Sequence, residues 1–158
     1  RKGYTVTAAT GRPETHPYLA ELGATAFVER TALAEKGGAL QKERWGGAVD
    51  SVGSTTLANV LAQTAYGGAV AACGLAGGMD LPATVAPHIL RGVSLLGIDS
   101  VMAPAAKRDS AWKTLAKHLD KAQLGRIARI EPMSSLPELA EDIVAGRIRG
   151  RVVIDVSR

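Results

Sequence analysis

The sequence has few of the residues that build disulfides and metal sites. Its 158 residues include one cysteine, Cys73, and three histidines. A single cysteine excludes an internal disulfide and a multi-cysteine zinc site, and His16, His88 and His118 show no metal-ligand spacing. We therefore expect no metal, and a reducing, cytoplasmic compartment is the default. Cys73 itself is expected to be a small core residue, and His88 and His118 are expected to be surface or satisfied side chains.

Long apolar runs and aromatic residues are also scarce. Aromatic residues make up 4% of the chain, and no stretch reaches the roughly 20 apolar residues that span a bilayer. We expect neither a membrane partner nor a signal peptide. The sequence opens at Arg1 without an initiator methionine, so we expect a truncated or processed chain.

The charge is modest and dispersed. There are 19 Lys and Arg residues against 15 Asp and Glu residues, a net charge of +4, and no tract is rich in basic residues. Nucleic-acid binding requires a concentrated basic stripe, so we expect no nucleic-acid partner. A solvated basic surface accounts for most of these charges, and the remainder favours a small anionic ligand.

Short apolar runs alternate with segments of helical period, and Gly or Asp ends most of the runs. Near-continuous apolar strands such as residues 69–73 are typical of a parallel sheet covered on both faces. The alternation predicts an α/β fold built from strand–helix–strand units. The predicted strands are 4–9, 26–28, 48–52, 69–73, 93–98, 126–131 and 151–156. The predicted helices are 15–22, 55–64, 85–90, 104–119 and 135–145, with a short helix or turn at 40–45.

Two helix starts carry capping signals. Ser54 is expected to cap the helix 55–64, and Ser135 with Glu138 has the spacing of a capping box. The pattern changes from Gly125 onward, where the strand 126–131 alternates polar and apolar residues.

The turn after the first predicted strand is the most informative motif. In a dinucleotide-binding fold, an acid after the second strand bonds the ribose 2′-hydroxyl and selects NAD. Here the turn reads Thr10-Gly11-Arg12 and has no acid. This turn favours the 2′-phosphate of NADP. Thr10 offers a hydroxyl, Gly11 lets the backbone approach closely, and Arg12 offers a planar fork of donors. The alternative is an exposed turn arginine before a proline, and no G-x-G-x-x-G motif precedes the turn.

Other strand ends are expected to meet at one edge of the sheet, where ligands bind in such folds. They lie at Gly53, at Cys73 to Leu75, and at Ile98 to Ser100. Each can equally be ordinary turn chemistry, and Asp99 and Ser100 can either order a ligand or cap the helix that Pro104 opens. Residues 74–78 superficially resemble a phosphate loop, but no helix follows them. Arg147, with Arg149 and Arg151, is either a solvated turn or a phosphate contact.

Long segments of the chain resemble a known family. Residues 40–53, 56–64, 66–78 and 89–100 together resemble the acrylyl-CoA reductase branch of the quinone-oxidoreductase-like, medium-chain dehydrogenase/reductases. The resemblance covers nearly the whole chain. It implies a zinc-free, NADPH-dependent enzyme that reduces acrylyl-CoA to propionyl-CoA by passing hydride to the β-carbon and a proton to the α-carbon.

The resemblance also implies which residues contact NADPH. The family's 2′-phosphate loop corresponds to Thr10, Gly11 and Arg12. The remaining cofactor contacts correspond to Gly53, Leu75, Ile98 and Ser100, and less directly to Ile89 and Arg147. No residue is identified as the proton donor.

The implied architecture is a truncated, doubly wound Rossmann-like sheet in residues 1–124, without its first strand and glycine-rich turn. Residues 125–158 are expected to be the return segment of a GroES-like domain. A homodimer is expected through the strand from Val93 to Ile98, because an apolar edge strand is prone to pairing. We expect the piece to be inactive alone. The alternatives are a quinone or enone reductase of the same superfamily, or a non-catalytic nucleotide-binding or dimerisation module.

Overall fold

The computed structural model describes residues 3–158, which form two compact units. The N-terminal unit runs to Pro104 and the C-terminal unit covers Ala105–Arg158. This boundary lies ahead of the expected domain border at 124/125, which stays a prediction. Among residues 3–158, no helix combines the length and the apolar character that crossing a bilayer requires.

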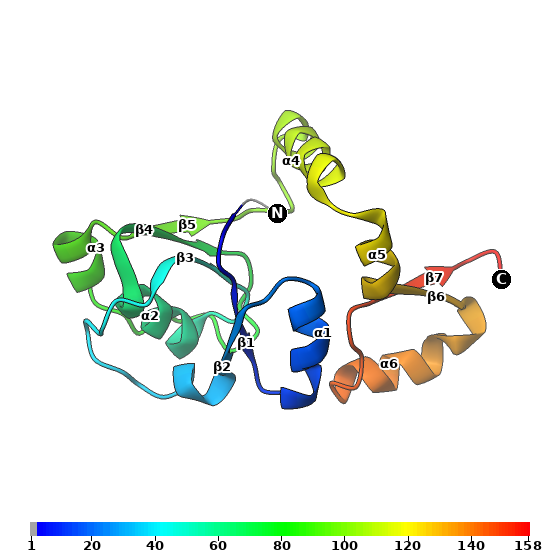
Figure 1. Cartoon of the computed structure of the whole chain (residues 1–158), viewed down its shortest axis with the longest axis horizontal. Helices are drawn as coiled ribbons and strands as arrows, with labels where there is room; N and C mark the ends of the chain where they lie inside the picture. Colours follow the sequence, from blue (N-terminus) through cyan, green and yellow to red (C-terminus); the bar gives the residue numbers. More distant parts are fainter. Residues whose placement is uncertain (1–2) are drawn as a thin grey trace. The chain divides into compact units, whose positions relative to one another are not determined.

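The N-terminal unit contains parallel strands only, in two sheets (Figure 1). In the small sheet, β1 (Thr7–Thr10) pairs with β2 (Ala26–Glu29). In the main sheet the order is β3 (Trp45–Asp50), β4 (Thr64–Ala72) and β5 (Ser94–Gly97). The predicted α/β fold with parallel sheets is confirmed. The strand order of the Rossmann fold is 3-2-1-4-5-6, and β1 to β5 correspond to its second to sixth strands. Among residues 3–158, no strand joins β1 to β3 in the place of the first strand.

Short helices connect these strands. The helices η1 (Pro13–Thr15) and α1 (His16–Glu21) join β1 to β2, and η2 (Arg30–Leu33) follows β2. The helix α2 (Ser54–Gln63) joins β3 to β4, and α3 (Ala86–Arg91) leads into β5. Gly92 ends α3 in the left-handed region at φ +59°, a conformation that glycine adopts without steric cost.

The core of this unit lies between α2 and the main sheet (Figure 1). Leu57, Val60 and Leu61 recur at helical spacing on one face of α2, and they pack with Leu33, Val70 and Val93. Leu61 and Val70 are each 0% exposed. Burying one such side chain stabilises a fold by about 1.5–3 kcal/mol, so this cluster fixes how α2 lies on β4.

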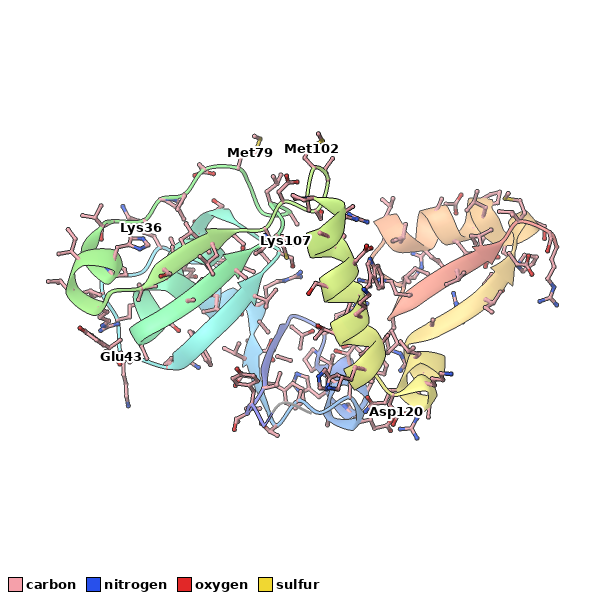
Figure 2. The ribbon with its side chains drawn as sticks, turned by 90° about the horizontal axis from the view of Figure 1, so that it is seen from above. Lys36, Glu43, Met79, Met102, Lys107 and Asp120 are labelled. Atoms are coloured by element: carbon pink, nitrogen blue, oxygen red, sulfur yellow. The ribbon has the colours of Figure 1, made fainter. Side chains whose placement is uncertain are left out.

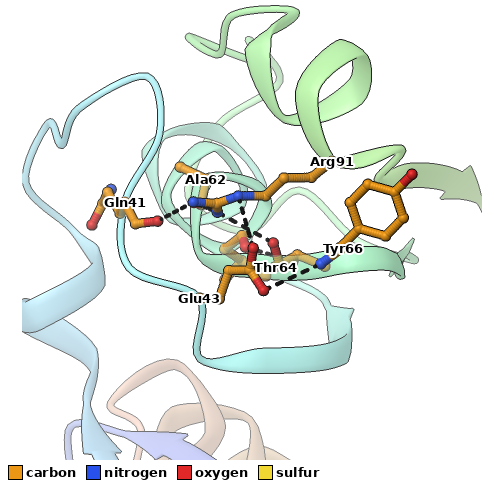
Figure 3. Close-up of polar contacts among 7 residues, drawn as sticks. Gln41, Glu43, Ala62, Thr64, Tyr66 and Arg91 are labelled. Carbon is orange, nitrogen blue, oxygen red and sulfur yellow. Dashed lines mark hydrogen bonds and ion pairs between the residues drawn. The ribbon is translucent and has the colours of Figure 1, made fainter.

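Arg91 closes the amino edge of the main sheet, where β4 begins (Figure 3). Its Nη1 donates to the carbonyl of Ala62 at 2.9 Å, and its Nη2 donates to that of Gln41 at 2.7 Å. Its Nε lies 3.2 Å from Glu43 Oε1, and the Arg91 side chain is only 17% exposed. The Arg91 guanidinium thereby links the end of α3, where it belongs, to the end of α2 and to the segment before β3.

The C-terminal unit is a strand–helix–strand motif preceded by helices. Its strands β6 (Ala128–Pro132) and β7 (Arg151–Asp155) are parallel, and α6 (Leu136–Val144) connects them through η3 (Met133–Ser135). The preceding helices are α4 (Ala105–His118) and α5 (Lys121–Ile127). No residue between 105 and 158 is buried, because one helix on a two-stranded sheet covers little of its apolar surface.

Three local predictions are wrong. Residues 41–44 form neither the helix nor the turn predicted at 40–45 and lead directly into β3, because their polar groups bond to α2 and α3 rather than to each other. The strand predicted at 126–131 starts at Ala128, because α5 continues through Gly125 and the Asp120 side chain caps it by accepting from Ala122 N at 2.9 Å. The capping box does not form, because Ser135 is helical and makes no side-chain cap bond.

Candidate functional site

The turn after β1 is held by two threonines. The Arg12 amide donates to Thr10 Oγ1 at 3.1 Å. The Arg12 carbonyl accepts from the amide of Thr15 at 2.9 Å and from its hydroxyl at 2.7 Å. Thr15 is buried while the Arg12 side chain is exposed. The structure therefore brings Thr10, Gly11 and Arg12 together in one ordered turn, with the guanidinium of Arg12 on a fixed backbone.

A second arginine, Arg30, also lies at this turn, and no local sequence pattern identified it. A Cβ placed on Gly11 would lie 3.2 Å from Arg30 Nη2 and 3.3 Å from Arg30 Nε. The guanidinium of Arg30 therefore rests over the backbone of Gly11. The signal that could have revealed it is the strand register, since Thr10 pairs with Glu29 and each next residue follows the same sheet edge.

The turn from β3 into α2 is shaped by Gly53. Gly53 has φ +75° and bridges to Gly78. Its amide donates to Asp50 Oδ2 at 2.8 Å, and Asp50 is 5% exposed. A Cβ on Gly53 would lie 2.7 Å from the Gly78 oxygen and 3.3 Å from Leu75 Cα. Only glycine fits between these backbones, so Gly53 and Leu75 are brought together as expected.

Ser54 does not cap α2 as expected. The helix begins at Ser54 itself, and Gly53 occupies the capping position. Ser54 has φ +46°, in the left-handed region that costs a non-glycine residue about 1 kcal/mol. Its hydroxyl donates to Asp80 Oδ1 at 3.1 Å, which ties the start of α2 to the loop after β4. The first part of that loop, residues 74–78, is a strand-end loop with no helix directly after it, as predicted.

Ile98 and Ser100 leave the same edge of the main sheet. Asp50 pairs with Ala72, and Ala72 pairs with Gly97, so the three carboxyl ends are aligned. The amide of Ile98 donates to the Ala72 carbonyl at 2.9 Å, and Ile98 is 45% exposed. We call this region, with Gly53, Leu75, Ile98 and Ser100, the carboxyl edge.

Asp99 shapes the turn that contains Ser100. Its Oδ1 accepts from the amides of Val101 at 2.8 Å and Met102 at 3.0 Å. Both amides lie ahead of α4, so these bonds shape the turn and do not cap the helix. Met102 is 80% exposed and Met79, in the loop after β4, is 86% exposed. Both project outward from the ribbon in Figure 2, so the loops beyond the carboxyl edge present apolar side chains.

Two expected contacts lie elsewhere. Ile89 is 73% exposed on α3, which leads into the amino end of β5 rather than away from its carboxyl end. Arg147 belongs to the C-terminal unit, where its Nε donates to Asp142 Oδ1 at 2.7 Å. The structure does not bring Ile89 to the carboxyl edge. The cofactor roles of Ile89 and Arg147 stay predictions.

Cys73 and His88 each contact one backbone carbonyl. Cys73 is exposed, not a core residue as expected, because it lies beyond the end of β4. Its thiol donates to the Asp50 carbonyl at 3.3 Å. His88 is satisfied, with Nδ1 2.7 Å from the Val93 carbonyl. Within residues 3–158, no three His, Cys, Asp or Glu side chains gather in a group that could hold a metal ion.

Comparisons with known proteins agree with this arrangement. Acrylyl-CoA reductase AcuI of Ruegeria pomeroyi is 53% identical over 156 residues, which are 98% of this chain and 47% of that protein. The crystal structure of the YhdH oxidoreductase from Salmonella enterica in complex with NADP superposes with a TM-score of 0.93 at 45% identity, covering 98% of this chain and 47% of that one.

A third relative carries a different nucleotide. The structure of Bacillus subtilis YhfP with NAD bound superposes with a TM-score of 0.91 at 44% identity, covering 98% of this chain and 48% of that one. The chain thus spans about half the length of the relatives it matches. A model of the family described as zinc-binding dehydrogenase matches residues 1–121. The family resemblance is therefore confirmed, and the chain belongs to the zinc-binding dehydrogenase family.

Proposed function

We propose that this chain is the NADPH-binding part of a reductase that converts acrylyl-CoA to propionyl-CoA. The observation that carries the proposal is the turn after β1. Where an acid would bond the ribose 2′-hydroxyl of NAD, the chain has an ordered turn with Thr10, Gly11 and Arg12. The 53% identity to the R. pomeroyi acrylyl-CoA reductase supports the substrate, and the NADP bound to the S. enterica protein supports the cofactor.

The described residues fit a dinucleotide. Gly11 leaves the backbone open beside the guanidinium of Arg30, and Gly53 packs so tightly that no Cβ fits beside Gly78. Thr10, Gly11 and Arg12 would hold the 2′-phosphate. The carboxyl edge would hold the rest of the cofactor, since ligands of open parallel sheets bind there. Ile89 and Arg147 are further proposed contacts that rest on the family resemblance alone.

The proposed chemistry divides between cofactor and protein. Bound NADPH supplies the hydride that forms a C–H bond at the β-carbon of the activated double bond. A proton then adds to the α-carbon, so that one double bond is reduced for each NADPH oxidised. The residues of this chain bind and orient: Arg12 fixes the phosphate end, while Leu75 and Ile98 give the carboxyl edge an apolar surface. None of residues 3–158 is assigned as the proton donor.

The activity is tested with the complete polypeptide of the source reading frame. We expect acrylyl-CoA to drive NADPH oxidation, with propionyl-CoA and NADP formed in equal amounts, measured by absorbance and by mass spectrometry of the thioesters. NADH at the same concentration is the control and should react more slowly. Absence of turnover with acrylyl-CoA would overturn the proposed substrate.

A quinone is the second candidate substrate, favoured by one observation. B. subtilis YhfP, which is 44% identical over 98% of this chain, is named provisionally as a quinone oxidoreductase. The kcat/KM values for acrylyl-CoA and for a simple quinone, measured side by side, separate the candidates. If kcat/KM is higher for the quinone, the quinone replaces acrylyl-CoA as the proposed substrate.

We also propose a homodimer through β5. This strand is the last of the main sheet, and Leu96 on it is 49% exposed. An exposed apolar edge strand pairs readily with a second copy of itself. Sedimentation of the complete polypeptide at micromolar concentration should show a dimer, and Leu96→Lys should shift it toward monomer. A monomeric wild type would contradict the proposal.

A further inference from the structure

We propose that Asp80 is a positioning residue for the cofactor: through its hydrogen bond with Ser54, it holds the loop that carries Leu75 in place at the carboxyl edge. The inference rests on the proposed NADPH function and adds to it a residue that acts through another rather than by contact with the nucleotide. It is carried by the bond from Ser54 Oγ to Asp80 Oδ1, which is 3.1 Å long, and by the backbone conformation of Ser54.

Ser54 has a strained backbone. Among residues 3–158, it is the only residue other than glycine with a positive φ, +46°. Such strain persists only where the surrounding structure imposes it, and it is concentrated at ligand-binding sites. Ser54 is the first residue of α2 and directly follows Gly53, so the strain is located at the carboxyl edge. This location points to a role for Ser54 in shaping the edge.

The bond between Ser54 and Asp80 fastens the loop after β4, in which Figure 2 labels Met79, to the start of α2. The backbone of this loop already docks on the end of β3, because the Gly77 amide donates to the Val52 carbonyl at 2.7 Å. Asp80 lies three residues further along the loop. Its side chain therefore adds a second attachment at the point where the loop leaves the end of β3.

Gly78 connects this attachment to Leu75. A Cβ on Gly78 would lie 3.1 Å from Asp80 Oδ1 and 3.2 Å from Ser54 Cβ, so the absence of a side chain there leaves room for the carboxylate to reach the hydroxyl. The Gly78 amide donates to the Leu75 carbonyl at 3.1 Å. A displacement of Asp80 is thus passed through Gly78 to the residue proposed to contact the cofactor.

The charge of Asp80 makes the proposed role separable from simple electrostatics. Asp80 is exposed, and its carboxylate has the same sign as the phosphates of NADPH. Charge repulsion alone predicts that removal of the carboxylate strengthens NADPH binding. A loop that is held in its bound position before the ligand arrives binds more tightly than one that must be ordered on binding. Positioning therefore predicts the opposite result, weaker binding when Asp80 is removed.

The test measures NADPH binding and loop mobility in the same proteins. NADPH is titrated by calorimetry into the complete polypeptide, without substrate, and amide hydrogen exchange of residues 74–80 is followed by mass spectrometry in the free protein. The variants are Ser54→Ala, Asp80→Ala, the double variant, and Asp80→Asn, which keeps an acceptor oxygen for Ser54. Glu35→Ala is the matched loss of one exposed acidic side chain in the same unit.

We expect Ser54→Ala and Asp80→Ala each to weaken NADPH by about 3- to 5-fold, within the range of one hydrogen bond, and to speed exchange in the loop. The double variant should lose no more than either single variant, because the two side chains act as a pair. Asp80→Asn should bind NADPH at least as tightly as the wild type, and Glu35→Ala should bind it as the wild type does.

The outcomes separate this inference from the function on which it rests. If the wild type binds NADPH and folded Asp80→Ala binds it equally well or more tightly, Asp80 does not position the cofactor site, while the NADPH function stands. Faster loop exchange without weaker binding overturns the inference in the same way. If the wild type itself does not bind NADPH, the proposed function fails as well. Thermal unfolding of each variant identifies a folding defect, and Ser54→Ala decides the matter if Asp80→Ala is unstable.

Discussion

The two edges of the main sheet are built in different ways. At the amino edge, side chains bridge elements that are distant in sequence: Arg91 contacts the carbonyls of Gln41 and Ala62, and Asn59 Nδ2 donates to the Leu33 carbonyl at 2.9 Å. At the carboxyl edge, the tightest contact is between backbones, at Gly53 and Gly78, and one exposed side-chain bond joins Ser54 to Asp80. A part-buried guanidinium thus organises one edge, while close backbone packing organises the other.

This difference predicts that a substitution at the amino edge affects stability more than binding. Arg91→Ala should lower the free energy of unfolding by about 3 kcal/mol, because it removes the guanidinium that donates to the part-buried carbonyls of Gln41 and Ala62 and pairs with Glu43. Urea denaturation measures the loss. The ratio of NADPH to NADH affinity should not change in the folded protein.

Arg44→Ala is the matched control at the same edge. Arg44 is exposed, and its Nη1 reaches Gln63 Oε1 only at 3.4 Å while its guanidinium lies 4.4 Å from the Trp45 ring centre. Its removal should cost less than about 1 kcal/mol. If both arginine variants lose the same free energy of unfolding, Arg91 contributes no more to stability than an exposed arginine does.

At the carboxyl edge, Gly53→Ala should weaken both stability and cofactor binding. The new methyl group would meet the Gly78 oxygen at 2.7 Å, and alanine is strained at φ +75°. We expect a loss of about 2–3 kcal/mol in unfolding free energy and weaker binding of both NADPH and NADH, measured by urea denaturation and titration.

Gly92→Ala separates backbone strain from crowding. Gly92 also has a positive φ, +59°, but a Cβ there would meet nothing within 4 Å. It should cost about 1 kcal/mol and leave nucleotide binding unchanged. If both glycine variants bind nucleotide like the wild type, the carboxyl edge does not contact the cofactor.

The smallest expected effect concerns the end of β7, a strand end in the other unit. Hydrogen bonds from the Ser157 hydroxyl at 2.6 Å and the Ser157 amide at 3.0 Å lower the pKa of Asp155 below its usual 3.8. Because the folded pKa is lowered, the associated stability is present above the usual pKa and is lost as pH falls through the lowered one. Ser157→Ala should raise the pKa of Asp155, as followed by carboxyl NMR; an unchanged titration would contradict this cause.

The sequence predicts the elements that local residues determine. Gly and Asp mark the ends of β3 and β4, Gly23 follows α1 at φ +109°, and the turn with Thr10, Gly11 and Arg12 is identifiable without the structure. Long-range contacts are what local patterns miss. Arg91 reaches Gln41 across 50 positions, and Arg30 meets Gly11 only through the pairing of β1 with β2. The absence of a helix at residues 40–44 has the same cause, since their bonds are made with α2 and α3.

The central claim is that the turn after β1 selects the phosphorylated cofactor, and titration of NADPH and NADH against wild type and Arg12→Ala tests it most directly. If Arg12 binds the 2′-phosphate, Arg12→Ala should weaken NADPH by about 1.5–3 kcal/mol and leave NADH nearly unchanged. Equal affinity of the wild type for both cofactors, or an equal loss for both in the variant, would contradict the account.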